Sequence, residues 1–481
     1  MICISIAQES RRLALADMLN AARSCDLLEM RLDRFGKAPD LGDILSVKPR
    51  PVIISCRRPR DGGLWDGSED ERLALLRQCI ISKADYVEIE LDVADQIRKF
   101  PPSKRVISYT NLDETPADIA DIYAQAQTKN PDVIKLTTLA RTPEEAWPLV
   151  QIMARAPVPT VVVGLGKPGV MLSVLGAKIG SPWTYAALER GMEAHPDQPT
   201  VSDLEEVYHY RAINRSTRFI GVTGFGERER ATVAALNAAF AHLNLSARCL
   251  PMGVGNVRLF GKVIEAVKLA GAVIDEHRQS ILQIATRREP SAERTGAADL
   301  ILHRDNQWHA SDTAIPSAAN ALESAMRAHS GSEHPLAGRM VLLAGVNDLA
   351  RGMARELKQR GSVLIFASRD RDVAQKLAQE MQCRYVQWEA LYTTIHDVLI
   401  VCERETAIHP GYLKPGMTVL DLTSPQQASG LLREAQVRGC GVVSPRECLL
   451  EQVSLQAHLL TSKEVPRQVL ADAAPWFGAE E

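Results

Sequence analysis

Residues 132–138 of the chain read Asp-Val-Ile-Lys-Leu-Thr-Thr, a strand-forming run with a single lysine, Lys135, in its middle. Because side chains alternate between the two faces of a strand, Lys135 points to the same face as Val133 and Thr137. A lysine in such a run lies either at an exposed sheet edge or inside the fold. A buried lysine loses affinity for its proton, and its neutral amine can attack a carbonyl group to form a Schiff base. The surroundings of Lys135 therefore decide between the two roles.

The run around Lys135 is one of eight strand-like segments in the first half of the 481-residue chain. Helical patterns lie between these segments and include residues 69–83 and 116–129. Strands that alternate with helices predict a parallel sheet, and eight such units close into a (β/α)8 TIM barrel, so the expected fold class is α/β. The eight segments are 2–7, 27–32, 52–56, 86–91, 105–109, 133–137, 160–164 and 183–187.

Several of these segments carry charged residues toward their C-terminal ends, where the active sites of TIM barrels gather. Unpaired buried charge is costly, so charges aimed from several strands at one end of the barrel indicate a site. Arginines suit a carboxylate, acids suit hydroxyl groups and a lysine suits a ketone, which predicts an anionic, hydroxylated substrate. A structural network of ion pairs is the alternative. The charged residues are Glu29, Arg31, Arg57, Glu88, Glu90 and Lys135.

Six short motifs follow one another along the first half: Glu-Met-Arg-Leu-Asp (29–33), Ser-Cys-Arg (55–57) with Asp-Gly-Gly (61–63), Ala-Asp-Tyr-Val-Glu-Ile-Glu-Leu (84–91), Ser-Tyr (108–109), Thr-Pro (115–116) and Val-Ile-Lys (133–135). In this order they resemble a type I 3-dehydroquinate dehydratase over residues 1–212. The resemblance implies that Lys135 forms an imine with the ketone of 3-dehydroquinate, and that loss of water then gives 3-dehydroshikimate. It also implies that four residues bind the substrate: Glu29, Arg31, Arg57 and Gln198.

The chain departs from this family at the groups that move protons and hold the substrate. The family's Ser-Tyr-His ends in Thr110 here, and a threonine cannot titrate near neutral pH. The arginine that holds the substrate carboxylate is replaced by Val174, and a serine by Ala194. His195 is a candidate substitute base, although a loop histidine is more often simply solvated. We therefore expect slow turnover that His195 does not restore.

The second half of the chain is expected to form two further α/β domains, at residues 218–330 and 337–475. The latter begins with a strand, a turn at Gly345, a helix and a second strand that ends in Ser368 and Arg369. Strand, glycine turn, helix and strand form the opening of a nucleotide-binding Rossmann domain. An arginine after the second strand suits the 2′-phosphate of NADP.

The dinucleotide motif is incomplete, because Gly345 is all that remains of the glycine fingerprint. Asn347 and Asp348 occupy the crowded turn, and the aspartate would repel a pyrophosphate. We expect weak NADP binding that is preferred over NAD. A Rossmann domain that binds no dinucleotide is the alternative.

The order of the three expected domains resembles the fused dehydroquinate dehydratase–shikimate dehydrogenase. That resemblance implies an NADP-dependent reduction of 3-dehydroshikimate to shikimate, with Lys262 and Asp312 as catalytic residues and Gln452 as a substrate ligand. The family has Pro-His where Phe260 and Gly261 precede the lysine. Its serine-rich substrate loop is replaced by Gly-Glu-Arg-Glu at residues 226–229.

The composition of the chain limits its possible partners, its possible metal sites and its cellular compartment. The net charge of −3, without a basic block, argues against nucleic acid as a partner, and no apolar run is long enough to span a membrane. Nine scattered cysteines without a CxxC pair suit reduced thiols in the cytoplasm and no metal site. Small molecules are the expected partners, and a homodimer is compatible with a sequence that does not determine oligomeric state. Two alternatives stay open: a Schiff-base lyase or aldolase for a related keto acid, and a non-catalytic or regulatory homologue.

Overall fold

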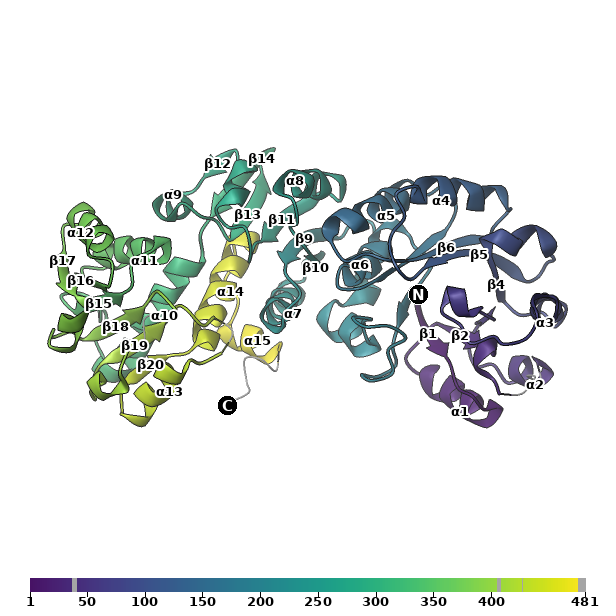
Figure 1. Ribbon diagram of the computed structural model, residues 1–481, viewed down its shortest axis with the longest axis horizontal. Coiled ribbons are helices and arrows are strands. Elements are labelled where there is room, and N and C mark those ends of the chain that lie inside the picture. The colour runs from purple at the N-terminus through teal and green to yellow at the C-terminus, as the bar shows by residue number, and fades with distance from the viewer. Residues whose placement is uncertain (37–40, 405–407, 426, 475–481) are drawn as a thin grey trace. The chain divides into compact units, whose positions relative to one another are not determined.

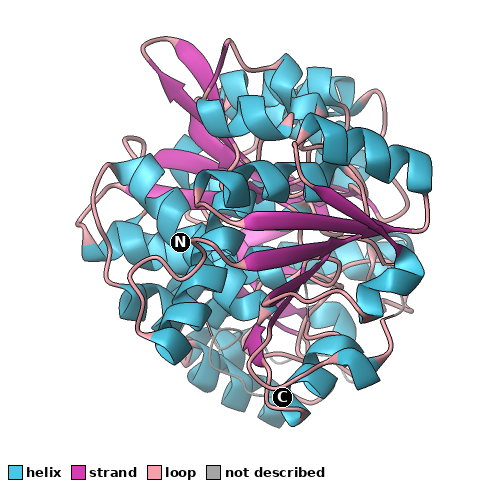
Figure 2. Ribbon diagram, turned by 90° about the vertical axis from the view of Figure 1, so that its left-hand side faces the viewer, coloured by secondary structure: helices cyan, strands magenta, loops and turns pink. Residues whose placement is uncertain are grey.

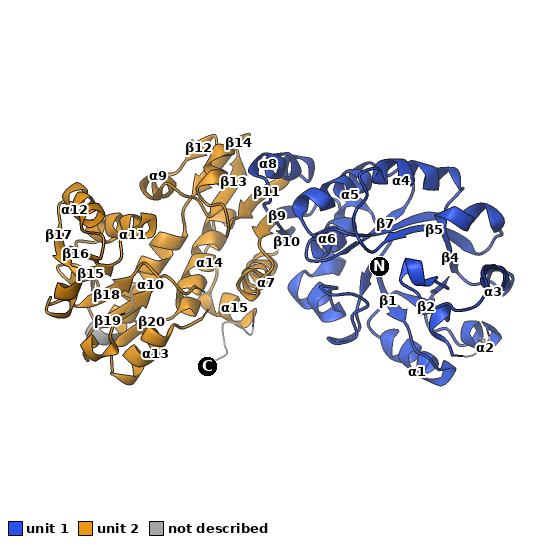
Figure 3. Ribbon diagram, viewed as in Figure 1, with its two compact units in different colours: residues 1–219, 246–268 blue, residues 220–245, 269–481 orange. Residues whose placement is uncertain are grey.

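The computed structural model describes residues 1–36, 41–404, 408–425 and 427–474. The chain forms two compact units, shown in different colours in Figure 3. The first contains residues 1–219 and 246–268, and the second contains residues 220–245 and 269–481. Nine cysteines are present and all are free thiols. Across the described ranges, no helix combines the length and apolarity needed to cross a bilayer, and no cluster of three His, Cys, Asp or Glu side chains is arranged to hold a metal ion.

The first unit contains an eight-stranded parallel barrel, as the alternation of strands and helices predicts. The strand order is β7-β6-β5-β4-β3-β2-β1-β8, and the end strands β7 and β8 contact each other. Apolar side chains from successive strands fill the interior at one level of the barrel, among them Cys3, Val106 and Trp183. The strands are β1 (Ile2–Ile6), β2 (Leu27–Arg31), β3 (Val52–Ser55), β4 (Tyr86–Glu90), β5 (Lys104–Asn111), β6 (Val133–Leu139), β7 (Thr160–Leu165) and β8 (Thr184–Ala186).

Helices follow most of the barrel strands and cover the outside of the sheet (Figure 1). The start of α3 shows how the sequence sets a boundary: Ser68 accepts the Glu71 N–H, and the Glu71 carboxylate accepts the Ser68 N–H. After β4 the connection is a 3-10 segment, Leu91–Gln96, instead of an α-helix. The helices are α1 (Arg11–Ala21), α2 (Leu41–Ser46), α3 (Glu69–Ile81), α4 (Ile119–Thr128), α5 (Pro143–Arg155) and α6 (Gly169–Ile179).

A second, six-stranded sheet has the order β10-β9-β11-β13-β14-β12. It is mixed, because β13 runs antiparallel to both β11 and β14. Helices α10 and α14 pack against each other. The strands are β9 (Arg218–Thr223), β10 (Ala247–Met252), β11 (Leu269–Val273), β12 (Arg287–Arg288), β13 (Leu300–Arg304) and β14 (Gln307–Ser311). The helices are α7 (Glu227–His242), α8 (Val257–Ala266), α9 (Pro290–Thr295), α10 (Ala314–Ser330), α14 (Pro445–Thr461) and α15 (Arg467–Asp472).

The third sheet has the order β17-β16-β15-β18-β19-β20, and every pair in it is parallel. Counted along the chain this is 3-2-1-4-5-6, the order of dinucleotide-binding domains, whose crevice lies between the first and fourth strands. These strands and the helices between them are labelled in Figure 1, and Figure 2 is viewed from the side that carries them. The strands are β15 (Met340–Ala344), β16 (Val363–Ser368), β17 (Arg384–Gln387), β18 (Val398–Val401), β19 (Thr418–Asp421) and β20 (Gly441–Val443). The helices are α11 (Asp348–Gln359), α12 (Arg371–Glu380) and α13 (Gly430–Val437).

Candidate active site

Lys135 belongs to a buried cluster of four charged side chains inside the barrel. Lys135 Nζ lies 2.9 Å from Glu88 Oε2 and 3.5 Å from Glu29 Oε1. The Arg57 guanidinium pairs with Glu29, and its Nε lies 3.4 Å from Glu88 Oε1. The side chains of Lys135, Glu88 and Glu29 are at most 3% exposed. Two cations and two carboxylates therefore offset one another's charge where water cannot do so.

The register of the parallel strands brings this cluster together. Lys135 on β6 lies beside Ser108 on β5, and Ser108 lies beside Glu90 on β4. The period of two then directs Glu88 to the same face as Glu90, toward the barrel interior. Glu29 reaches the cluster from β2. Residues far apart in the sequence thus meet because each strand turns one face inward.

The cluster keeps Glu29 ionised. Burial by itself raises the pKa of this carboxyl, but the charges of Arg57, Lys135 and Arg31 outweigh burial and hold the pKa of Glu29 well below its usual range. Burial lowers the pKa of the Arg57 guanidinium, and Glu29 and Glu88 raise it above its ordinary value. A fixed carboxylate beside the Lys135 nitrogen can stabilise the positive charge that a protonated imine carries there.

Two charged residues that the sequence directs toward this end of the barrel have other partners. Arg31 forms a two-hydrogen-bond pair with Asp33, at 2.9 and 2.7 Å, and donates to the Gly62 carbonyl at 3.0 Å. Glu90 pairs with Arg72 at 2.8 Å. The sequence analysis did not single out Asp33 as the partner of Arg31. Asp33 lies two residues after Arg31, in the turn just past the end of β2, and this short separation was the available signal.

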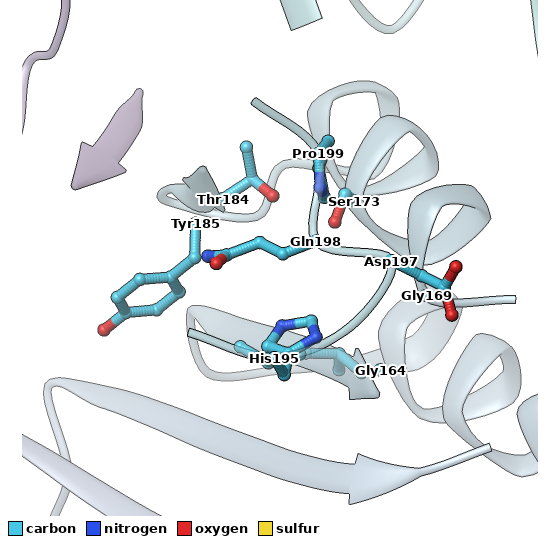
Figure 4. A pocket seen from close by; sticks show the side chains of 11 residues that line it. Gly164, Gly169, Ser173, Thr184, Tyr185, His195, Asp197, Gln198 and Pro199 are labelled. Atoms are coloured by element: carbon cyan, nitrogen blue, oxygen red, sulfur yellow. The ribbon is translucent and has the colours of Figure 1, made fainter. Parts of the chain in front are cut away.

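A small pocket at the C-terminal ends of β7 and β8 contains Gln198 (Figure 4). Tyr185 and His195 line the same pocket. Lys135 Nζ lies 4.5 Å from the centroid of the Tyr185 ring, so Tyr185 connects the pocket with the charged cluster. Gln198 Oε1 accepts the Ala194 N–H at 2.7 Å, which closes the loop that carries His195.

His195 lies against the pocket wall and is only partly exposed. Its Nδ1 lies 2.9 Å from the Pro196 carbonyl oxygen. An Nδ1–H that donates to this carbonyl leaves Nε2 as the acceptor nitrogen of the ring. Burial lowers the pKa of His195 despite the opposing effect of the Pro196 carbonyl, so the neutral form is favoured at neutral pH.

The substituted family positions bring no titratable group to this site. Thr110 on β5 lies beside Thr137 in the register, one inward position beyond Ser108, and is half-buried. Val174 is fully buried in α6. The barrel therefore has neither a histidine at residue 110 nor an arginine at residue 174.

Comparison with known proteins agrees with this geometry. Residues 2–215 match the family model described as type I 3-dehydroquinase. A 3-dehydroquinate dehydratase of Methanopyrus kandleri is 32% identical over 194 residues, which cover 38% of this chain and 87% of that protein. The chain belongs to the type I 3-dehydroquinase family. The resemblance stated from the sequence motifs is thereby confirmed.

In this member of the 3-dehydroquinase family, the glycine turn of the third sheet binds one of the chain's own carboxylates. Gly345 has a φ of +99°, and a Cβ on it would meet Glu403 Cγ at 2.7 Å. The Val346 N–H donates to Glu403 Oε1 at 2.7 Å. Asn347 caps α11 by accepting the Ala350 N–H at 2.9 Å. Glu403, which follows β18, thus lies where the pyrophosphate of a dinucleotide approaches such a turn.

The residues around this turn differ in how well they fit a dinucleotide. Arg369 is exposed, and its guanidinium lies 5.5 Å from the centroid of the Trp388 ring. Ser368 Oγ accepts the Asp370 N–H at 3.2 Å. Asp348 accepts a hydrogen bond from Gln279 at 2.9 Å at the start of α11. With Glu403, two carboxylates lie at the turn, so the turn as it stands does not fit a pyrophosphate.

Gln452 on α14 is part of a buried polar network. Its Nε2 donates to Asp299 Oδ2 at 2.5 Å, and its Oε1 accepts from Arg228 at 2.8 Å. The same carboxylate accepts the Thr313 hydroxyl at 2.7 Å. Both ends of the Gln452 amide are thus bonded to protein, and one partner, Arg228, belongs to the segment that replaces the serine-rich loop.

Asp312 and Lys262 have different surroundings. Asp312 is 2% exposed, and its Oδ1 lies 2.7 Å from Arg278 Nη2. Burial and the nearby Asp299 raise the pKa of Asp312, and Arg278 offsets part of that effect. Lys262 is exposed on α8, in the other compact unit. The ion-pair partner of Asp312 within its own unit is Arg278.

One curated relative matches nearly the whole chain. The bifunctional 3-dehydroquinate dehydratase/shikimate dehydrogenase of Arabidopsis thaliana, a chloroplastic protein, is 26% identical over 476 residues, which cover 92% of this chain and 79% of that protein. Among solved structures, the dehydroquinate dehydratase and shikimate dehydrogenase of S. pombe AroM is 16% identical with a TM-score of 0.46, covering 98% of this chain and 97% of that one.

Proposed function

We propose that the barrel catalyses Schiff-base dehydration of 3-dehydroquinate to 3-dehydroshikimate. The observation that carries this proposal is the buried Lys135 amine, which has Glu88 at 2.9 Å and Glu29 at 3.5 Å. The substrate follows from the name of the relatives, 3-dehydroquinate dehydratase. A ketone that also carries a carboxylate and hydroxyl groups suits a cluster of one amine, one guanidinium and two carboxylates.

The steps assign roles to three members of the cluster, Lys135, Glu88 and Glu29. Glu88 takes a proton from the Lys135 ammonium, and the neutral amine attacks the ketone carbon. The adduct loses water and becomes a protonated imine, whose charge Glu88 and Glu29 stabilise. The imine acidifies the neighbouring C–H bond, and loss of that proton and of a hydroxyl group as water forms the double bond. Hydrolysis of the imine releases the product and restores Lys135.

Reductive trapping tests this proposal directly. Borohydride added to the protein with 3-dehydroquinate converts an imine to a stable secondary amine. We expect mass spectrometry to find the adduct on the peptide that contains Lys135, and a spectroscopic assay to find formation of 3-dehydroshikimate. A protein that gains no mass and forms no product would contradict the proposal and favour a binding or regulatory role.

For the second half we propose weak NADP binding that is preferred over NAD. Arg369 supports the preference, because a guanidinium can pair with a 2′-phosphate through two hydrogen bonds. Glu403 and Asp348 weaken the binding, because a pyrophosphate must displace one carboxylate and approach the other. Reduction of 3-dehydroshikimate to shikimate by Lys262 and Asp312 remains a prediction, which rests on the activity in the name of the A. thaliana relative.

Replacing Glu403 by alanine is expected to tighten NADP binding about tenfold, the equivalent of removing one unfavourable contact of roughly 1.4 kcal/mol. The variant frees the Val346 N–H and removes a negative charge from the turn. Calorimetric titration with NADP and NAD measures the change, and Glu434→Ala on the exposed face of α13 is the control. An unchanged NADP affinity in Glu403→Ala would mean that the carboxylate does not compete with phosphate.

We further propose that the protein acts in the cytoplasm on small molecules alone. Nine free thiols support a reducing compartment. The domain boundaries 1–212, 218–330 and 337–475, and a homodimeric assembly, remain predictions from the sequence. Size-exclusion chromatography with light scattering and limited proteolysis test them.

A further inference from the structure

The side chain of Tyr185 on β8 carries a buried hydroxyl group that makes no hydrogen bond to the described residues. The residue is 6% exposed, and among the residues that the structure describes its hydroxyl has no hydrogen-bond partner. Buried hydroxyl groups are normally paired, because burial without a partner costs free energy. Such a group in a candidate active site requires an explanation.

The position of Tyr185 points to a ligand. Its ring faces Lys135 Nζ at 4.5 Å, and Figure 4 shows the phenol oxygen at the end of the ring that is remote from Gln198. Ser108 Oγ, another buried polar atom beside the cluster, also has no hydrogen-bond partner among the described residues, and Arg57 Nε makes no hydrogen bond beyond its 3.4 Å ion pair with Glu88. Ser108 is the register partner of Lys135. Unpaired polar atoms thus gather around the one lysine that the proposed chemistry uses.

We propose that the Tyr185 hydroxyl donates a hydrogen bond to an oxygen of the bound keto acid and thereby orients its ketone toward Lys135. This inference rests on the proposed dehydratase function and adds a substrate-binding residue to it. The donor role follows from the protonation state. Burial, reinforced by Glu29, holds the pKa of Tyr185 well above its ordinary value, so the hydroxyl keeps its proton at neutral pH.

A purely structural Tyr185 would act through its ring, which fills the barrel interior and faces the Lys135 ammonium. Phenylalanine keeps that ring and removes only the hydroxyl, so Tyr185→Phe separates the two roles. A matched control is Tyr123→Phe on α4. Tyr123 is also buried in this unit, but its hydroxyl is paired with Thr160 Oγ1 at 3.0 Å.

Tyr185→Phe is expected to change catalytic activity, and Tyr123→Phe is expected to change thermal stability. Tyr185→Phe should lower kcat/KM for 3-dehydroquinate about 10- to 100-fold, the usual effect of losing one hydrogen bond to a substrate, while its Tm stays unchanged or rises. Tyr123→Phe should lower Tm and leave kcat/KM unchanged. Steady-state kinetics, thermal melts and the yield of the borohydride adduct are measured on the full-length protein. The split between KM and kcat shows whether the bond forms in the ground state or in the transition state.

The outcomes separate the role of the Tyr185 hydroxyl group from the dehydratase proposal. A wild-type adduct together with equal kcat/KM in wild type and Tyr185→Phe overturns the role of the hydroxyl and leaves the dehydratase proposal intact. A lower Tm in Tyr185→Phe that accounts for the lost activity also overturns it, in favour of a structural role. A wild-type protein that forms neither adduct nor product overturns the dehydratase proposal, and the inference about Tyr185 with it.

Discussion

Replacement of Lys135 by methionine is expected to abolish the borohydride adduct and to lower kcat by roughly 10³-fold or more, the scale on which loss of a covalent nucleophile acts. The reason is chemical, because no other lysine belongs to the described cluster of Glu29, Arg57 and Glu88. The variant also leaves two buried carboxylates with one cation. Removing one member of a buried ion cluster costs about 3–5 kcal/mol, so Tm should fall as well.

Two further variants separate chemistry from stability. Lys135→Arg keeps a positive charge beside Glu88 but has no amine that can form an imine, so it should be as inactive as Lys135→Met and more stable. Lys104→Met removes an exposed lysine at the start of β5 and should leave both activity and adduct unchanged. Turnover that persists in Lys135→Arg would exclude an imine at this residue.

Replacement of Thr110 by histidine is expected to raise the rate of dehydration by about 10²–10⁴-fold, the range that a general acid–base group contributes. Thr110 turns inward on β5 one position beyond Ser108, the neighbour of Lys135. An imidazole there would project into the mouth of the barrel above the lysine. Acting as a base, it would add to the pH–rate profile a limb that rises through the ordinary range of histidine, near pH 6.5.

The non-titrating variant Thr110→Gln is the control for side-chain size. It should show neither the faster rate nor the new limb. An unchanged or lower rate in a well-folded Thr110→His variant would mean that another group already moves the proton. His195→Ala then becomes the informative variant, because His195 shares a pocket with Tyr185 and has an acceptor nitrogen at neutral pH.

The sequence by itself determined the barrel and the inward direction of its charged residues. Strand-like segments separated by helical patterns require parallel strands, and the period of two along residues 132–138 fixes the face to which Lys135 points. The same logic directed Glu29, Glu88 and Glu90 to the interior. It also found the strand–turn–helix path at Gly345. All of these are local properties, because backbone geometry over a few residues sets them.

Only the tertiary structure decided which charges meet. Alternation treats Glu88 and Glu90 alike, yet Glu88 pairs with Lys135 and Glu90 with Arg72. The partner of Lys135 lies 47 residues away in the chain, and the contact of Glu403 with the Gly345 turn spans 57 residues. Such distances are set by strand register, barrel closure and strand order, which depend on the packing of the whole sheet. No short stretch of sequence contains that information.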